Sequence, residues 1–414
     1  MSEIYSMKHC LKYPYFTLDL AASEPFTWSG ACTYSYRRLW LRRALFTFGA
    51  INLVYQNIGM LIYLFMPHES SAQSTIVQVT ETGGIMGLTM VGTSNMLVMF
   101  WYGDRIAMLL EKFQQLFPTA RLQRKAKFTK RPLRGVEFPH RIEHFVLKAN
   151  KLMKLATTLY LFAFAYYNSL PIVEFLYEWT TPGVVWKYRY QSNTWYPWQN
   201  ERNTKSFASF TLAYVCQVQS SLTGVAFIMA AEFMLCFFTT QLQIHFDYLA
   251  NALETIDAAG ANANEELKYL INYHSQLLSY SKETNAIFNV SFMVNFCTSA
   301  IAICLMSFSM VMISLAHAFK YSIGLTSFIV FTFFICYTGK ELTETSDKLL
   351  NAAFYGNWYD GNLAYRKMIL FFIMRCRIPT ELKAYKFTTV SMPTFTAILR
   401  SSYSLFTFFQ AMGQ

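Results

Sequence analysis

The sequence predicts an all-α membrane protein with seven transmembrane helices. Of its 414 residues, 54% are hydrophobic and only 14% are charged, whereas a soluble globular chain has about 25% charged residues. Six windows contain no Asp, Glu, Lys or Arg, and a seventh apolar span runs almost to the carboxyl end. About 20 such residues cross the ~30 Å hydrocarbon core. The windows are Ala44–Phe65, Thr82–Tyr102, Leu155–Val173, Ser206–Ala231, Asn285–Phe319 and Tyr321–Gly339.

Basic residues predict how these spans are oriented. The segments expected on one side of the membrane hold 29 Lys and Arg, and those on the other side hold 5. Because positive residues favour the cytoplasm, the amino terminus is expected inside and the carboxyl terminus outside. The net charge of +11 therefore reflects topology, and we expect contact with membrane lipid but no nucleic-acid partner.

The order of segments follows from these spans. No apolar stretch precedes residue 44, so the first span is expected to act as the insertion signal. The fourth and fifth apolar runs are longer than a bilayer requires, so they are expected to project into the cell with a cytoplasmic helical anchor region. The predicted segments are a cytoplasmic tail (1–43), spans one to four (44–242) with an outer aromatic loop (177–205), a cytoplasmic loop (243–284), spans five and six (285–339), the anchor region (340–386) and the seventh span (387–414).

Enzyme chemistry has little support in the sequence. His140-Arg-Ile-Glu-His144 fits a zinc-peptidase pattern, but it lies in a basic segment and no third ligand follows, so we interpret it as a chance match. Phosphate-binding and serine-hydrolase motifs are absent from the sequence, and no cofactor is expected.

A ligand pocket is predicted in the outer halves of the spans. Aromatic and methionine side chains recur there at helical spacing, which is typical of helix packing or of an apolar cavity with a few hydroxyl groups. Such a cavity suits a small volatile molecule. The candidate ligand-binding residues are Met86, Met90, Tyr160, Phe164, Tyr167, Phe210, Tyr214 and Phe328.

Three separated segments resemble the insect odorant receptor family. They are Trp195-Tyr-Pro-Trp198, the stretch Ser346–Gly361, and Ser402-Tyr-Ser-Leu-Phe-Thr407. The end of the chain departs from the pattern of the related gustatory receptors. The 243–284 loop lacks the enlargement of the shared co-receptor (Orco), so the chain resembles an odour-tuning subunit.

The resemblance implies a mechanism. Odorant receptors are odour-gated cation channels in which four subunits surround one pore, so the odorant co-receptor subunit (Orco) is the implied partner. The pore or gate residues implied are Arg400, Phe406, Phe409 and Gln410, with Phe406 at a constriction that excludes hydrated ions. A seven-transmembrane metabotropic (G-protein-coupled) chemoreceptor is the alternative, and a transporter is a third class.

Overall fold

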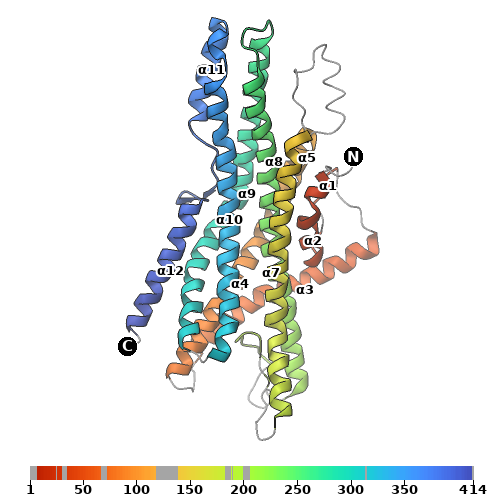
Figure 1. Cartoon of the computed structure of the whole chain (residues 1–414). Coiled ribbons are helices and arrows are strands. Elements are labelled where there is room, and N and C mark those ends of the chain that lie inside the picture. The colour runs from red at the N-terminus through yellow and green to blue at the C-terminus, as the bar shows by residue number, and fades with distance from the viewer. Residues whose placement is uncertain are drawn as a thin grey trace.

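The computed structural model is a bundle of long helices (Figure 1). It describes residues 7–24, 26–29, 35–66, 72–117, 139–181, 188, 190–198, 206–312 and 315–412. The basic stretch 121–134 therefore lies outside the described part, and so does the side chain of His140. The helices are α1 (Met7–Cys10), α2 (Lys12–Leu20), α3 (Tyr36–Phe65), α4 (Ala72–Trp101), α5 (Gly103–Leu116), α7 (Pro139–Thr180), α8 (Phe207–Thr255), α9 (Ala263–Met312), α10 (Leu315–Tyr355), η1 (Trp358–Asp360), α11 (Leu363–Cys376) and α12 (Met392–Met412).

Seven of these helices carry the seven predicted spans, so the all-α fold is confirmed. Among the described residues, six helices are long and apolar enough to cross a membrane: α3, α4, α7, α8, α9 and α10. The seventh, α12, has 21 residues but is diluted by Ser, Thr, Gln and one Arg. The only strands in the described part are β1 (Lys383–Ala384) and β2 (Thr388–Thr389), which pair antiparallel just before α12.

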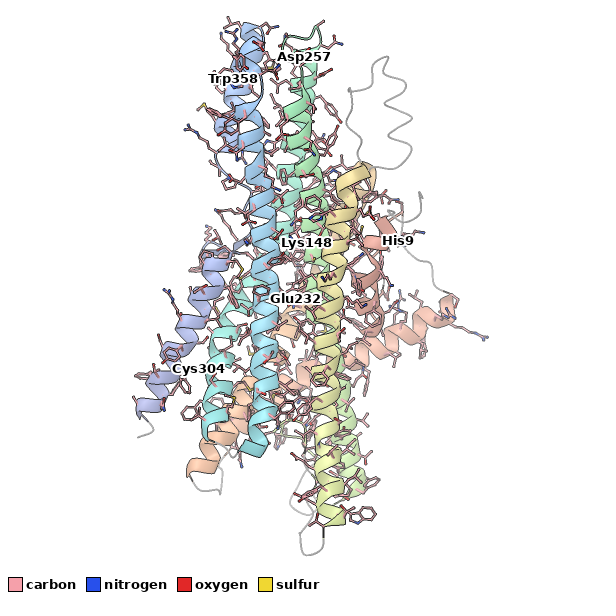
Figure 2. All side chains as sticks on the ribbon, in the orientation of Figure 1. His9, Lys148, Glu232, Asp257, Cys304 and Trp358 are labelled. Atoms are coloured by element: carbon pink, nitrogen blue, oxygen red, sulfur yellow. The ribbon has the colours of Figure 1, made fainter. Side chains whose placement is uncertain are left out.

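Helix α8 is the centre of the bundle. In its most apolar stretch, 89% of the residues are buried, and it packs against α2, α3, α4, α7, α9 and α10. A helix that is apolar all round is expected to be enclosed by other helices. Its central carboxylate, Glu232, lies within the bundle (Figure 2).

The amino-terminal segment is not a free tail. Helix α2 packs against α8, and α3 begins at Tyr36, ahead of the predicted first span at Ala44. The added turns of α3 carry arginines. Arg42 forms an ion pair with Asp19 at 2.7 Å, and Arg43 pairs with Glu24. These pairs explain why the helix starts early: its charged end has partners in the preceding segment.

The boundary between the fifth and sixth spans was predicted too far along the chain. Helix α9 ends at Met312 and α10 begins at Leu315, so Phe319 belongs to α10. No charged residue lies between Asn285 and Phe319, and charge was the signal used to divide the spans.

One end of the bundle is extended beyond the spans. Helices α8 and α9 continue to a turn between Thr255 and Ala263, and α11 folds back beside α10. Lys148 of α7 pairs with Glu341 of α10 at 2.6 Å and ties these helices together. The carboxyl end of α12 lies at the opposite end of the bundle from α11 (Figure 1).

Candidate functional site: a cavity among the outer helices

A cavity lies between α4, α7, α8, α9 and α10. The empty space between its lining atoms is about 700 Å³. Its walls are mainly aliphatic and aromatic, as is typical of small-molecule sites. One lining side chain from each helix is Leu88 on α4, Tyr167 on α7, Ile228 on α8, Met306 on α9 and Phe328 on α10.

The tyrosines of the cavity are held by hydrogen bonds at its two ends. The hydroxyl of Tyr160 donates to Oε2 of Glu232 at 2.8 Å, and the hydroxyl of Tyr167 donates to the carbonyl oxygen of Lys320 at 2.8 Å. Lys320 in turn forms an ion pair with Glu81 of α4. Both tyrosine rings are therefore fixed, which gives the cavity a defined shape.

Two glycines allow close packing in the wall of this cavity. A Cβ atom at Gly84 would lie 2.5 Å from Cε of Met306, and one at Gly324 would lie 2.6 Å from the hydroxyl oxygen of Tyr167. Both distances are shorter than ordinary van der Waals contact. Glycine at these positions therefore lets the Met306 and Tyr167 side chains approach the helix backbones.

Four of the eight predicted ligand-binding residues line the cavity: Tyr160, Phe164, Tyr167 and Phe328. They come from two helices that are far apart in sequence and lie side by side in the bundle. The interpretation of these aromatic positions as cavity lining therefore agrees with the geometry.

The other four predicted residues lie outside the lining. Met90 is 42% exposed, and Met86 is half-buried on the same helix. The ring of Phe210 stacks on Tyr188 with centroids 4.6 Å apart, and Tyr214 donates its hydroxyl to the carbonyl oxygen of Asn168. Phe210 and Tyr214 thus pack against the outer segment and the wall of the cavity.

Sequence reasoning missed several lining residues. Met306 was missed because its helix, α9, was not assigned to the pocket. Gly324 on α10 was missed because a glycine adds nothing to an aromatic or methionine pattern. Asn168, Gln191 and Ser221 also line the cavity. A polar residue on an apolar helix, such as Asn168, is the one available clue, because polar groups within membrane helices usually face protein.

The described residues 188 and 190–198, between α7 and α8, are called the outer segment, and its centre folds inward. Tyr196 of the Trp195-Tyr-Pro-Trp198 element is 1% exposed, and its ring stacks on Tyr55 of α3 at 5.5 Å. Tyr177 and Trp179 are 69% and 66% exposed. The described centre of the predicted outer aromatic loop therefore packs against α3, whereas Tyr177 and Trp179 at the end of α7 are exposed.

The seventh helix has two different faces. Ile398 and Ser402 are buried against the bundle, and α12 packs on α9 and α10. The face turned away from them carries a polar stripe at helical spacing, which we name the α12 polar stripe. It consists of Thr396, Arg400, Tyr403, Thr407 and Gln410, all exposed.

The predicted pore residues are distributed over both faces of α12. Arg400 and Gln410 belong to the polar stripe. Phe406 is half-buried and lies two turns after Ile398, on the bundle side, with its ring 6.4 Å from that of Tyr403. Phe409 is 42% exposed. Among the described residues no group of three His, Cys, Asp or Glu side chains is arranged to hold a metal ion.

Long apolar helices, five of them around an apolar cavity, define a multi-pass membrane protein. The family model of the 7tm Odorant receptor matches residues 75–403. The chain belongs to the insect odorant receptor family, and it is a chemoreceptor of the plasma membrane and not an enzyme.

Two relatives and one solved structure match this chain over nearly its whole length. Odorant receptor 69a, isoform B, of Drosophila melanogaster is 36% identical over 399 residues, which cover 96% of this chain and 97% of that protein. Odorant receptor 85c of the same organism is 24% identical over 411 residues, covering 97% and 98%. The insect olfactory receptor OR5 from Machilis hrabei in complex with eugenol has a similar fold, with a TM-score of 0.77 at 15% identity and coverage of 98% and 99%.

Proposed function

We propose that the chain binds a small volatile odorant in the cavity between α4, α7, α8, α9 and α10. The single observation that carries this proposal is the cavity, a space of about 700 Å³ that is partly open to solvent and walled by apolar and aromatic side chains. Burial of an apolar ligand there is favourable by about 25 cal/mol per Å². Tyr160 and Tyr167 are each held in place by a hydrogen bond, so little ordering cost falls on the ligand.

The same proposal includes a channel. A charged side chain in contact with lipid is expensive, so Arg400 is expected to face protein or water. Arg400 is exposed on a single chain and lies on the α12 polar stripe. Assembly of several subunits around their seventh helices would turn these stripes toward a water-filled path for cations. Phe406 and Phe409 lie off the stripe, with Phe406 on the bundle side of α12, and they are proposed as the apolar constriction because the family resemblance implies it.

The proposed partner is the odorant co-receptor subunit (Orco). Copies of this chain alone would bring several Arg400 side chains together in one narrow path, where like charges repel. A heteromer with the co-receptor lowers the number of these charges. We therefore propose a heteromeric non-selective cation channel in which this chain is the odour-tuning subunit.

The deciding experiment is to co-express the chain with the co-receptor and record currents against an odour panel. Expected are odour-evoked cation currents with both subunits, and little current from this chain alone. A matched pair of variants links the current to the cavity. Phe328→Ala should change the odour concentration that gives half-maximal current, whereas Phe371→Ala on the exposed face of α11, 73% exposed, should not.

A metabotropic receptor is the alternative function. It would need an intracellular carboxyl terminus and would signal through a G protein. Tags at both termini, read on intact and permeabilised cells, test this, since the proposal expects an extracellular carboxyl terminus. Currents abolished by a G-protein inhibitor, or an intracellular carboxyl tag, would favour the alternative.

A further inference from the structure

A second, smaller cavity adjoins the odorant cavity. The space between its lining atoms is about 380 Å³, and the two cavities share the lining residues Ile85, Leu88, Gln191, Ser221 and Val225. The second cavity, which we name the polar annex, reaches toward α3 and the inward-folded outer segment. Its further walls are Gln56, Met60, Thr89, Ser192, Gln217, Ser220 and Gly224.

Hydrogen bonds hold the walls of the polar annex in place. Gln56 donates through Nε2 to the hydroxyls of Ser192 at 2.6 Å and Thr194 at 2.8 Å. Gln217 donates to the carbonyl oxygen of Ser192 at 3.1 Å and accepts from the backbone N–H of Gln191 at 3.1 Å. These bonds join α3, α8 and the outer segment, so the annex does not depend on a ligand for its shape.

Two polar atoms in the annex have no partner among the described residues. They are the hydroxyl oxygen of Ser220, a residue that is 1% exposed, and Oε1 of Gln191. A buried polar atom without a partner costs about 1–3 kcal/mol, so such an atom calls for an explanation. Ser220 lies one helical turn after Gln217, whose amide holds the backbone of Gln191, so the two atoms belong to one small region.

In the main cavity, by contrast, the side-chain hydroxyl groups have acceptors within the protein. Its hydroxyl groups already donate within the protein: Tyr160 to Glu232, Tyr167 to the carbonyl of Lys320 and Ser327 to the carbonyl of Ile323 at 2.8 Å. Ser221, shared by both cavities, donates to the carbonyl of Val218 at 3.0 Å. The unpartnered atoms of Ser220 and Gln191 therefore lie in the annex and where it joins the main cavity, because Gln191 lines both cavities.

From this contrast we infer that the polar annex is a binding site for the hydroxyl group of an odorant whose apolar body fills the main cavity. A hydroxyl is both a donor and an acceptor. It can donate to Oε1 of Gln191 and accept from the Ser220 hydroxyl, and so supply both missing partners. The ligand class is a volatile alcohol or phenol with one hydroxyl at the end of an apolar skeleton. This inference rests on the proposed function.

The test compares matched odorants on matched variants. Cells that express the chain with the co-receptor are exposed to linear, cyclic and aromatic alcohols, each paired with its methyl ether, which keeps the oxygen but cannot donate. The wild type should respond to the alcohols at lower concentrations than to the ethers. Gln191→Met removes the acceptor for the ligand's O–H, so it should raise the half-maximal concentration of alcohols by about tenfold, which is the loss of one hydrogen bond, and leave the ethers nearly unchanged. Ser220→Ala removes the donor to the ligand oxygen, which alcohols and ethers share, so it should raise the half-maximal concentration of both.

The control variant is Ser221→Ala, because the hydroxyl of Ser221 lines both cavities but is already bonded to Val218. It should shift alcohols and ethers equally if it shifts them at all. Surface labelling normalises every current. Equal potency of alcohols and ethers on the wild type would overturn the inference, and so would parallel shifts of both in Gln191→Met or an unchanged alcohol response in Ser220→Ala. Absence of all odour-evoked current would instead contradict the proposed function itself.

Discussion

Replacing Gly324 with Ala gives a sharp test of how the odorant cavity is shaped. A Cβ at position 324 would lie 2.6 Å from the hydroxyl oxygen of Tyr167, whereas Sδ and Cε of Met306 would lie at 3.4 and 3.5 Å, which is ordinary contact. The tyrosine hydroxyl is therefore the one neighbouring atom that has to move. Its displacement breaks the 2.8 Å hydrogen bond to the carbonyl of Lys320.

The size of the effect follows from that bond. Leaving a buried hydroxyl without its partner costs about 1–3 kcal/mol. The displaced ring would occupy space in the cavity, and a ligand that fills this space would force the hydroxyl back against the new Cβ, into the contact that displaced it. The cost then falls on ligand binding, so the half-maximal odour concentration should rise by about 5–150-fold in cells that co-express the co-receptor.

A second substitution tests whether the hydroxyl of Tyr167 causes this effect. Tyr167→Phe removes the oxygen that the new methyl group would meet, and with it the reason for the displacement. The double variant Gly324→Ala with Tyr167→Phe should therefore respond no worse than Tyr167→Phe alone. If the two shifts add instead, the close contact with the hydroxyl is not the cause, and the shape of the cavity has to be explained in another way.

Three further predictions follow from other contacts. Glu232→Leu should lower the midpoint of thermal unfolding of the purified subunit, because it leaves the buried hydroxyl of Tyr160 unpaired at a cost of about 1–3 kcal/mol. Glu232→Gln keeps an acceptor for this hydroxyl, so its midpoint should remain near that of the wild type. Glu81→Gln should weaken odour responses by loosening the contact with Lys320 at the cavity end, and exchanging the two charged residues should restore them; no recovery in the exchanged pair would contradict this. Phe406→Ser should raise odour-independent current per surface receptor if Phe406 forms the constriction, and an unchanged basal conductance would remove it from the gate.

The sequence was sufficient for the fold because the membrane imposes a simple rule. Seven apolar spans appear in seven separate helices, since each backbone polar group in lipid has to be satisfied within its own helix. The same signal could not separate α9 from α10. Charged residues mark where a chain leaves the bilayer, and none lies between Asn285 and Phe319.

The cavity was predicted only in part because its walls depend on contacts between distant segments. Phe164 was predicted from its helical spacing with Tyr160 and Tyr167, Phe328 was predicted as an aromatic residue in the outer half of its span, and both line the cavity. Phe210 has equally suitable spacing, but its ring stacks on Tyr188 of the outer segment instead. A periodic pattern identifies the inward face of a helix, but it does not distinguish a ring that packs on protein from one that meets open space.

The polar annex could not be predicted from sequence at all. Gln191 lies in an irregular segment with no periodicity, and the bond from Gln56 to Ser192 joins residues 136 positions apart. The composition of the outer segment drew attention to its aromatic residues, so its small polar residues were overlooked. The structural information there lies in which buried atoms lack a partner, and a sequence does not record this.

Helix α10 offers a direct connection from the odorant cavity to the proposed pore helix. Phe328 of α10 lines the cavity. Five residues later, about 7.5 Å along the helix axis, the ring of Phe333 packs edge-on against Phe395 of α12 with centroids 5.6 Å apart. Helix α9 contacts α12 as well and carries Met306 in the cavity wall. A ligand that displaces either helix would therefore act on α12 through side chains in contact, and a channel built on α12 would need no additional moving element to respond to it.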